Sequence, residues 1–399
     1  MKNEFELSNE QLVEIANDLD SKIYKGMTVD GSEIKCIPTF IQPNKEGVKG
    51  EATVFDLGGT NFRAATVRVG DSTDVMGLVE KKFESMKTPG YTREDLFNAI
   101  FQVAGTLNPK DGSGVGYCFS YPTKSLINGD AELICWTKGV NIPDMEGKPV
   151  GRTLIDYLNS KTLKSYGKVT VVNDTITSLF AGLSYSGHDA YIGLIVGTGT
   201  NMAAFYPSTA IPKLKHLKEW SGDTPVNLES GNFHPPHLTK YDDAVDAKSD
   251  NVGFQRFEKA ISGMYVGRIF YEVFPNDGFD PNMDAAKLSH VMRHPAEYKP
   301  EHSEVAYQIY IRSAKLAAAS IAGLVASLVK VTPTIKDVMV LAEGPMFWSN
   351  EVYKNAVYVN TINETLPQVL TAMGYGDVSV KITRMANANL IGAAISVLS

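Results

Sequence analysis

The sequence has little cysteine, no long run of one charge sign and no low-complexity linker. Its three cysteines, Cys36, Cys118 and Cys135, show no Cys-x-x-Cys spacing, so neither a disulfide framework nor a zinc site is indicated. A net charge of -7 at pH 7 argues against a nucleic-acid or anionic-membrane surface, because such surfaces need basic clusters. We therefore expect small-molecule partners and a reducing, cytoplasmic location.

The chain also lacks a recognisable targeting segment. Its first residues, MKNEFELSNEQ, do not have the basic-then-apolar order of a signal peptide. The longest apolar stretch, Leu316–Val329, is roughly fourteen residues long and too short to span a bilayer. We expect it to be part of a buried helix. With 43% hydrophobic residues, a chain of this length predicts roughly two or three domains with sizeable cores.

Strand-like and helix-like segments alternate along the chain, with hairpins interposed. Helices are expected at Leu7–Ile23 with Ser8 as its cap, Glu94–Leu107, Val150–Lys164, Thr175–Leu183, Gln255–Val273, Ser303–Val331 and Leu390–Leu398. Strands are expected at Ile34–Ile41, Gly114–Tyr121, Ala131–Thr137, Lys168–Asn173 and Val338–Leu341. This order predicts mixed α/β domains rather than an all-parallel doubly wound sheet.

The segment FDLGGTNFR, Phe55–Arg63, predicts a hairpin whose tip can bind phosphate. Glycines let the backbone turn with positive φ, and successive turn N–H groups form an anion-binding concavity. Thr60 and Asn61 add side-chain donors, and Asp56 could hold a metal ion through water. An ordinary Gly-Gly hairpin turn, with Asp56 capping it, is the alternative.

A second segment, IGLIVGTGTN at Ile192–Asn201, repeats this order of strand, glycine-rich turn and returning strand. The shared GTN suggests two similar halves, although two hairpins with the same turn chemistry would look alike. Facing one another, two such tips could both touch one polyphosphate. No Walker or protein-kinase glycine loop is present.

Asp174 directly follows the strand Lys168–Asn173, where α/β sheets place their ligands. A carboxylate there can accept a proton from a hydroxyl group; a helix N-cap is the alternative role. Residues suited to binding several sugar hydroxyls are Ser120, Thr137, Lys138, Asn173, Asn201, Glu229 and Glu258. The histidines are scattered, and His234 and His237, which flank two prolines, are interpreted as a solvated loop rather than a metal site.

The sequence resembles the eukaryotic-type hexokinase family, the hexokinase and glucokinase group, over most of its length. Seven stretches stand in family order: FDLGGTNFR, FSYP with WTKGVNIPDMEGKPV, VNDT, IGLIVGTGTN, NLESGNF, TKYDDAVD and GFQRFEKAISGMYVG. The resemblance implies a two-lobed actin-like, ribonuclease-H-like ATPase fold with a cleft. It also implies ATP-dependent phosphorylation of the 6-hydroxyl of a hexose, with glucose, mannose and fructose as candidates.

The resemblance also assigns roles to residues at matching positions. Asp174 would be the general base, with Lys138 and Arg63 as further catalytic groups. Ser120, Thr137, Lys138, Asn173, Asp174, Asn201, Glu229 and Glu258 would bind sugar, whereas Asp56, Gly58, Gly59, Thr60, Asn61, Arg63, Gly197, Thr198 and Gly344 would bind ATP, with Asp56 serving Mg²⁺. The sequence departs from the family near Glu343–Met346 and Ala386–Ala394, on the adenosine side.

These departures leave two alternatives, a catalytically silent hexose sensor and a kinase that uses another phosphoryl donor. The resemblance further places residues 1–50 and 173–384 in a large domain and residues 51–172 and 385–399 in a small one.

Overall fold

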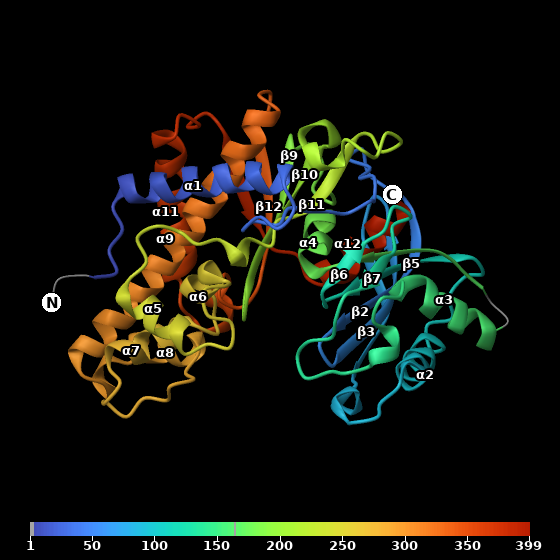
Figure 1. Cartoon of the computed structure of the whole chain (residues 1–399), viewed down its shortest axis with the longest axis horizontal. Helices are drawn as coiled ribbons and strands as arrows, with labels where there is room; N and C mark the ends of the chain where they lie inside the picture. The colour runs from blue at the N-terminus through green and yellow to red at the C-terminus, as the bar shows by residue number, and fades with distance from the viewer. Residues whose placement is uncertain (1–3, 163–164) are drawn as a thin grey trace.

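The computed structural model, described here for residues 4–162 and 165–399, has two lobes, each with a mixed β-sheet at its centre (Figure 1). The strands of the smaller lobe are β2 Gly50–Gly58, β3 Asn61–Val69, β4 Asp74–Lys82, β5 Ser113–Phe119 and β8 Tyr166–Val172, with a separate pair β6 Thr123–Ser125 and β7 Ala131–Leu133. Those of the larger lobe are β1 Ile37–Pro38, β9 Ala190–Val196, β10 Thr200–Pro207, β11 Asp223–Asn227, β12 Asp337–Glu343 and β13 Ser379–Thr383.

The two sheets share one strand arrangement. The smaller has the order β4-β3-β2-β5-β8, and the larger contains β11-β10-β9-β12-β13 with β1 added at its edge. In each, the first three strands are antiparallel neighbours and the last two run parallel to the central one. The matching topology supports the expectation of two similar halves, and the mixed sheets confirm the predicted fold class.

Helices surround and separate the sheets. They are α1 Asn9–Thr28, α2 Arg93–Ala104, α3 Val150–Lys161, α4 Asp174–Gly182, α5 Lys240–Ala247, α6 Arg256–Ile261, α7 Val266–Val273, α8 Ala285–Arg293, α9 Pro300–Val331, α10 Ser349–Val352, α11 Val357–Ala372 and α12 Ala388–Leu398. In Figure 1, α1, α9 and α11 lie on one side of the larger sheet, and α4 and α12 lie between the two sheets.

The α4–α12 pair joins the lobes. One apolar cluster contains Val54 of the small sheet, Leu179 of α4, Leu341 of the large sheet and Ile391 of α12. The helices cross closely because α12 carries Gly392, where a Cβ atom would lie 1.8 Å from the carbonyl oxygen of Thr177. The predicted domain limits, with residues 1–50 and 173–384 in a large domain and residues 51–172 and 385–399 in a small one, remain predictions.

Most expected elements are present, with shifted ends. The first helix begins after Ser8, whose side chain caps it in a capping box with Gln11. The predicted helix Gln255–Val273 is wrong as one element: it is split into α6 and α7, because the N–H of Gly263 donates to the carbonyl of Gly197, 2.7 Å away, instead of continuing the helix. The predicted strand Ile34–Ile41 is reduced to β1, which pairs with β11 at Ile37 and Pro38.

Two other predicted elements differ from the structure in length or extent. The predicted strand Ala131–Thr137 ends at Leu133, where its pairing with β6 ends; the last two residues of the predicted helix Val150–Lys164 lie outside the described residues.

Helix α9 has 32 residues and is long and apolar enough to cross a membrane by length and composition alone. However, 78% of its most apolar 18-residue window is buried inside the protein, as expected of a core helix.

Candidate active site

The first glycine-rich tip joins β2 to β3 and is open on its outer side. Gly58 pairs with Asn61 across the turn, and Gly59 adopts a φ of 72°. The carbonyl of Gly59 accepts a 2.8 Å hydrogen bond from the Tyr121 hydroxyl, which ties the tip to the segment that follows β5. A Cβ atom at Gly58 would meet no atom within 4 Å. The tip therefore has free space where a ligand can approach its backbone.

Asp56 and Arg63 face each other beside this tip. Arg63 Nε donates to Asp56 Oδ2 over 2.9 Å, and its Nη2 contacts the same oxygen. The other oxygen, Oδ1, is buried and has no hydrogen-bond partner among the described residues. A buried acceptor without a partner is costly unless a ligand uses it, so this carboxylate fits a water-coordinated Mg²⁺ ion.

A cavity of about 640 Å³ opens above the first tip. Of the residues expected to bind nucleotide, Asp56, Gly58, Asn61 and Arg63 line it. Three residues of β4 and one of α12 were not expected there: Glu80, Lys81, Lys82 and Asn389. The lysines end the exposed strand β4, which carries no sequence motif that would single them out.

The second tip joins β9 to β10. Protein atoms occupy the Cβ positions of its glycines, and Gly199 also lines the cavity between the lobes. A Cβ atom at Gly197 would lie 3.1 Å from Pro345, and one at Gly199 would lie 2.5 Å from Glu258 Oε2. Gly344 has a φ of 107°, and its Cβ would lie 2.3 Å from the carbonyl oxygen of Val196. Gly197, Thr198 and Gly344 line neither cavity at this site, and the same holds for Gly59 and Thr60 of the first tip.

Asp174 is the first residue of α4, but Asn173 caps the helix. The Asn173 side chain accepts a 2.8 Å hydrogen bond from the N–H of Ile176, whereas Asp174 Oδ1 accepts only from the adjacent N–H of Thr175 and, at 3.4 Å, from its hydroxyl. The alternative that Asp174 serves as the N-cap is therefore wrong. Burial raises the pKa of the Asp174 carboxyl above its usual value; the positive charge of Lys138 opposes this shift and Asp56 adds to it.

A second cavity, of about 600 Å³, lies between the lobes. All of the expected sugar-binding residues line it: Ser120, Thr137, Lys138, Asn173, Asp174, Asn201, Glu229 and Glu258. They come from both lobes, so closure of one lobe on the other would change the shape of this cavity.

Asn227 organises the polar wall of this cavity and was missed from the sequence. Its Oδ1 accepts from Asn201 Nδ2, and its Nδ2 donates to Glu229 Oε1, both over 2.7 Å. Glu229 is held in the left-handed region with a φ of 54°. Asn227 ends β11 just as Asn173 follows β8, and that position at a strand end was the available signal.

Glu258 reaches the cavity from α6 and touches the second tip. Its Oε2 accepts a 3.0 Å hydrogen bond from the N–H of Thr200. Burial raises the pKa of Glu258, and the Thr200 N–H opposes that shift. The neighbouring Lys259 is buried and donates to Asp246 Oδ1 over 2.6 Å, which fixes α6 beneath Glu258.

The two cavities share Ser120, Lys138 and Asp174 as lining residues. Lys138 has a φ of 59°, and its Nζ donates to the carbonyl of Ser120 over 2.7 Å. A group bound in one cavity can thus meet a group bound in the other at the Asp174 carboxylate.

The fold and site define a protein of the two-lobed actin-like class. The chain belongs to the hexokinase family: models described as Hexokinase match residues 1–184 and 191–275. Hexokinase-2 of Oryza sativa subsp. japonica is 34% identical over 282 residues, which cover 66% of this chain and 56% of the rice protein. The chain thus matches only about half the length of such curated relatives.

Solved structures show the same fold. The hexokinase from Schistosoma mansoni complexed with glucose has a TM-score of 0.77 at 22% identity, covering 99% of this chain and 96% of that one. A ROK family glucokinase from Streptomyces griseus in complex with glucose and AMPPNP has a TM-score of 0.52 at 17% identity, covering 86% of this chain and 98% of that one.

Proposed function

We propose that this protein transfers the γ-phosphoryl group of ATP to the 6-hydroxyl of a hexose, with Asp174 as the general base. The observation that carries the proposal is the position of Asp174, Lys138 and Ser120 at the junction of the two cavities. Phosphoryl transfer needs an acceptor hydroxyl, a donor phosphate and a base at one point, and this junction provides such a point.

The cavity between the lobes is the sugar site. Its wall presents carboxylates at Glu229 and Glu258 and amides at Asn173 and Asn201, which are acceptors and donors for hydroxyl groups. A site that hydrogen-bonds each hydroxyl rejects a sugar that lacks one, because buried polar groups would then lose their partners. Glucose is the first candidate, since related structures were determined in complex with it.

The cavity above the first tip is the site of the phosphates. Lys81, Lys82 and Arg63 supply positive charge there. Bound Mg²⁺, held through water by Asp56, would neutralise part of the negative charge on the phosphate oxygens. In the reaction, the Asp174 carboxylate accepts the proton of the 6-hydroxyl. The hydroxyl oxygen bonds to the γ-phosphorus, and the bond from that phosphorus to the bridging oxygen of ADP breaks.

The test compares Asp174→Asn with the wild type in a coupled assay for glucose 6-phosphate with ATP and Mg²⁺. Removing a general base is expected to lower kcat by about 10²–10⁴-fold, with glucose affinity in calorimetry changed less than about threefold. Asp71→Asn is the control, because the Asp71 side chain is 93% exposed. Equal losses of rate and of glucose affinity would assign Asp174 a binding role instead.

A different donor is the second candidate, and one observation favours testing it. The segment after β12, which contains Gly344 and Pro345, packs against the second tip and lines neither cavity. A panel of ATP, GTP, ADP and polyphosphate, each with glucose, mannose and fructose, would identify donor and acceptor. Glucose binding without turnover with any donor would favour the silent sensor.

For the location we propose the cytoplasm, supported by the three unpaired cysteines.

A further inference from the structure

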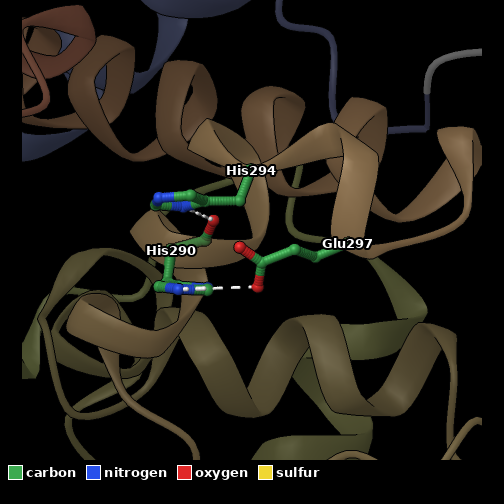
Figure 2. Close-up of side chains that lie close together, drawn as sticks. All are labelled: His290, His294 and Glu297. Carbon is green, nitrogen blue, oxygen red and sulfur yellow. Dashed lines mark hydrogen bonds and ion pairs between the residues drawn. The ribbon is translucent and has the colours of Figure 1, made fainter.

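Two histidines and a glutamate gather at the end of α8, apart from both cavities of the active site. His290 lies in the last turn of α8, His294 caps the helix, and Glu297 belongs to the short 3-10 turn Pro295–Glu297 that follows. Figure 2 shows the His290 and His294 rings stacked on each other, with the Glu297 carboxylate beside the His290 ring. One ligand atom from each lies within 4.8 Å of the other two.

We propose that His290, His294 and Glu297 form a binding site for a divalent transition metal, Zn²⁺ in particular. Imidazole nitrogen and carboxylate oxygen are common zinc ligands, and three protein ligands leave a fourth position for water. Two histidines four residues apart project from one face of a helix. That spacing, His-x₃-His, was the signal in the sequence.

The hydrogen bond of His294 leaves one defined nitrogen of its ring for a metal ion. His294 Nδ1 lies 2.9 Å from the carbonyl oxygen of His290, and since a carbonyl only accepts, this nitrogen carries the proton. The lone pair of neutral His294 is therefore on Nε2. Zinc-bound histidines commonly use such a bond from the second nitrogen to fix the ring and its tautomer.

His290 also makes a hydrogen bond through Nδ1. This nitrogen lies 3.0 Å from the hydroxyl of Tyr298, which accepts from Lys287 Nζ over 3.1 Å and can either accept from the ring or donate to it. Its Nε2 faces Glu297 Oε2 at 3.8 Å. This distance is too long for a hydrogen bond but close to the separation of two ligands about 2 Å from one metal ion.

The two rings must adjust to bind a metal ion. Their centroids lie 4.0 Å apart at an interplanar angle of 18°, so the Nε2 lone pairs do not yet converge. Rotation about χ2 of a histidine is soft, and the His290 side chain is 42% exposed, so neighbouring atoms leave room for the rotation.

A bound ion would connect the end of α8 to the turn before α9. The other end of α8 is already linked to the active site. The N–H of Ala285 donates to the carbonyl of Gly263, and the N–H of Gly263 donates to the carbonyl of Gly197. The metal would therefore brace the helix that supports the second glycine-rich tip.

The experiment measures Zn²⁺ binding by isothermal titration calorimetry to the full chain carrying Cys135→Ser, which removes the one exposed thiol. We expect one ion per chain, and loss of that binding event in His290→Ala/His294→Ala. Glu297→Gln and Tyr298→Phe should each weaken binding about tenfold, the latter by releasing His290 Nδ1. His216→Ala, an exposed histidine elsewhere, is the control that should bind normally.

Thermal melting with and without Zn²⁺ is the second readout. The ion should raise Tm in the parent chain and in His216→Ala, but not in the double variant, whose circular dichroism confirms that it is folded. The proposal would be overturned if Zn²⁺ did not bind at concentrations up to about 100 μM, or if it bound equally well to the double variant. These measurements use no sugar or nucleotide, so they are independent of the kinase activity.

Discussion

The two glycine-rich tips of this protein begin from the same sequence pattern and the same strand topology, yet they use their glycines differently. At the first tip, a Cβ atom on Gly58 would meet open space. At the second, Cβ atoms on Gly197 and Gly199 would press on Pro345 and Glu258. The first tip leaves open space beside Gly58, where we propose that phosphate binds, whereas the second needs its glycines so that protein segments can pack against it.

This difference shows that a shared turn motif does not by itself imply a shared role. The first tip is bordered by charged side chains, Asp56 and Arg63, and by a cavity. The second is braced by the backbone of Gly263 and by the segment at Gly344. Substitutions at matched glycines should therefore separate stability from activity.

The largest effect is expected for Gly344→Ala. The new methyl group would clash with the Val196 carbonyl at a φ of 107°, so we expect the free energy of unfolding to fall by about 3 kcal/mol or more, measured by chemical denaturation. Gly374→Ala is the matched control, since its φ is 87° but no atom lies within 4 Å of its Cβ. It should cost only about 1–2 kcal/mol. Similar losses for both variants would show that Gly344 is needed for its φ alone.

Gly58→Ala is expected to show the opposite behaviour. Its methyl group meets no protein atom, so unfolding free energy should change by less than about 0.5 kcal/mol. The new methyl group would instead displace a phosphate bound in the cavity above the first tip. We therefore expect kcat/KM for ATP to fall about 10- to 100-fold. Gly70→Ala, beyond the far end of β3, has its nearest neighbour at 3.9 Å and serves as the control. Normal kinetics in Gly58→Ala would remove the first tip from the phosphate site.

Gly199→Ala should have an intermediate effect, mainly on the binding of the sugar. Its methyl group would push aside the carboxylate of Glu258, the end of a flexible side chain, and weaken the 3.0 Å bond from the Thr200 N–H. We expect KM for glucose to rise about tenfold, with KM for ATP changed much less. A larger change for ATP than for glucose would contradict the packed role of this tip.

The smallest expected effect is a shift in the pH profile. Because burial raises the pKa of Asp174, kcat/KM should fall with decreasing pH through a midpoint above the ordinary aspartate value of about 3.9. Lys138 opposes that shift, so Lys138→Met should move the midpoint to higher pH while also lowering the rate. A midpoint that stays fixed or moves down in this variant would show that Lys138 does not act on the Asp174 carboxyl.

Local sequence patterns were sufficient for the hairpins, the helix after Ser8 and the position of Asp174 at the end of a strand. They were insufficient where a distant backbone group intervenes. Residues 262–265 interrupt the predicted helix Gln255–Val273, because Gly263 is a poor helix former and its N–H donates to the distant carbonyl of Gly197. The strand β4, with Lys81 and Lys82, carries no pattern that distinguishes it from an ordinary exposed edge.

The sequence by itself determined the mixed α/β architecture, because hydrophobic periodicity, glycine turns and strand-end polar residues are local properties. Its resemblance to hexokinases in seven ordered stretches determined the family, the two-lobed fold and the set of sugar-binding residues that line the cavity between the lobes. Only the tertiary structure decided that Asn173 rather than Asp174 caps α4, that Asn227 joins Asn201 to Glu229, and that one glycine tip is open and the other packed. Those outcomes depend on contacts between segments far apart in the chain, and no local pattern encodes which atoms will fill the space beside a glycine.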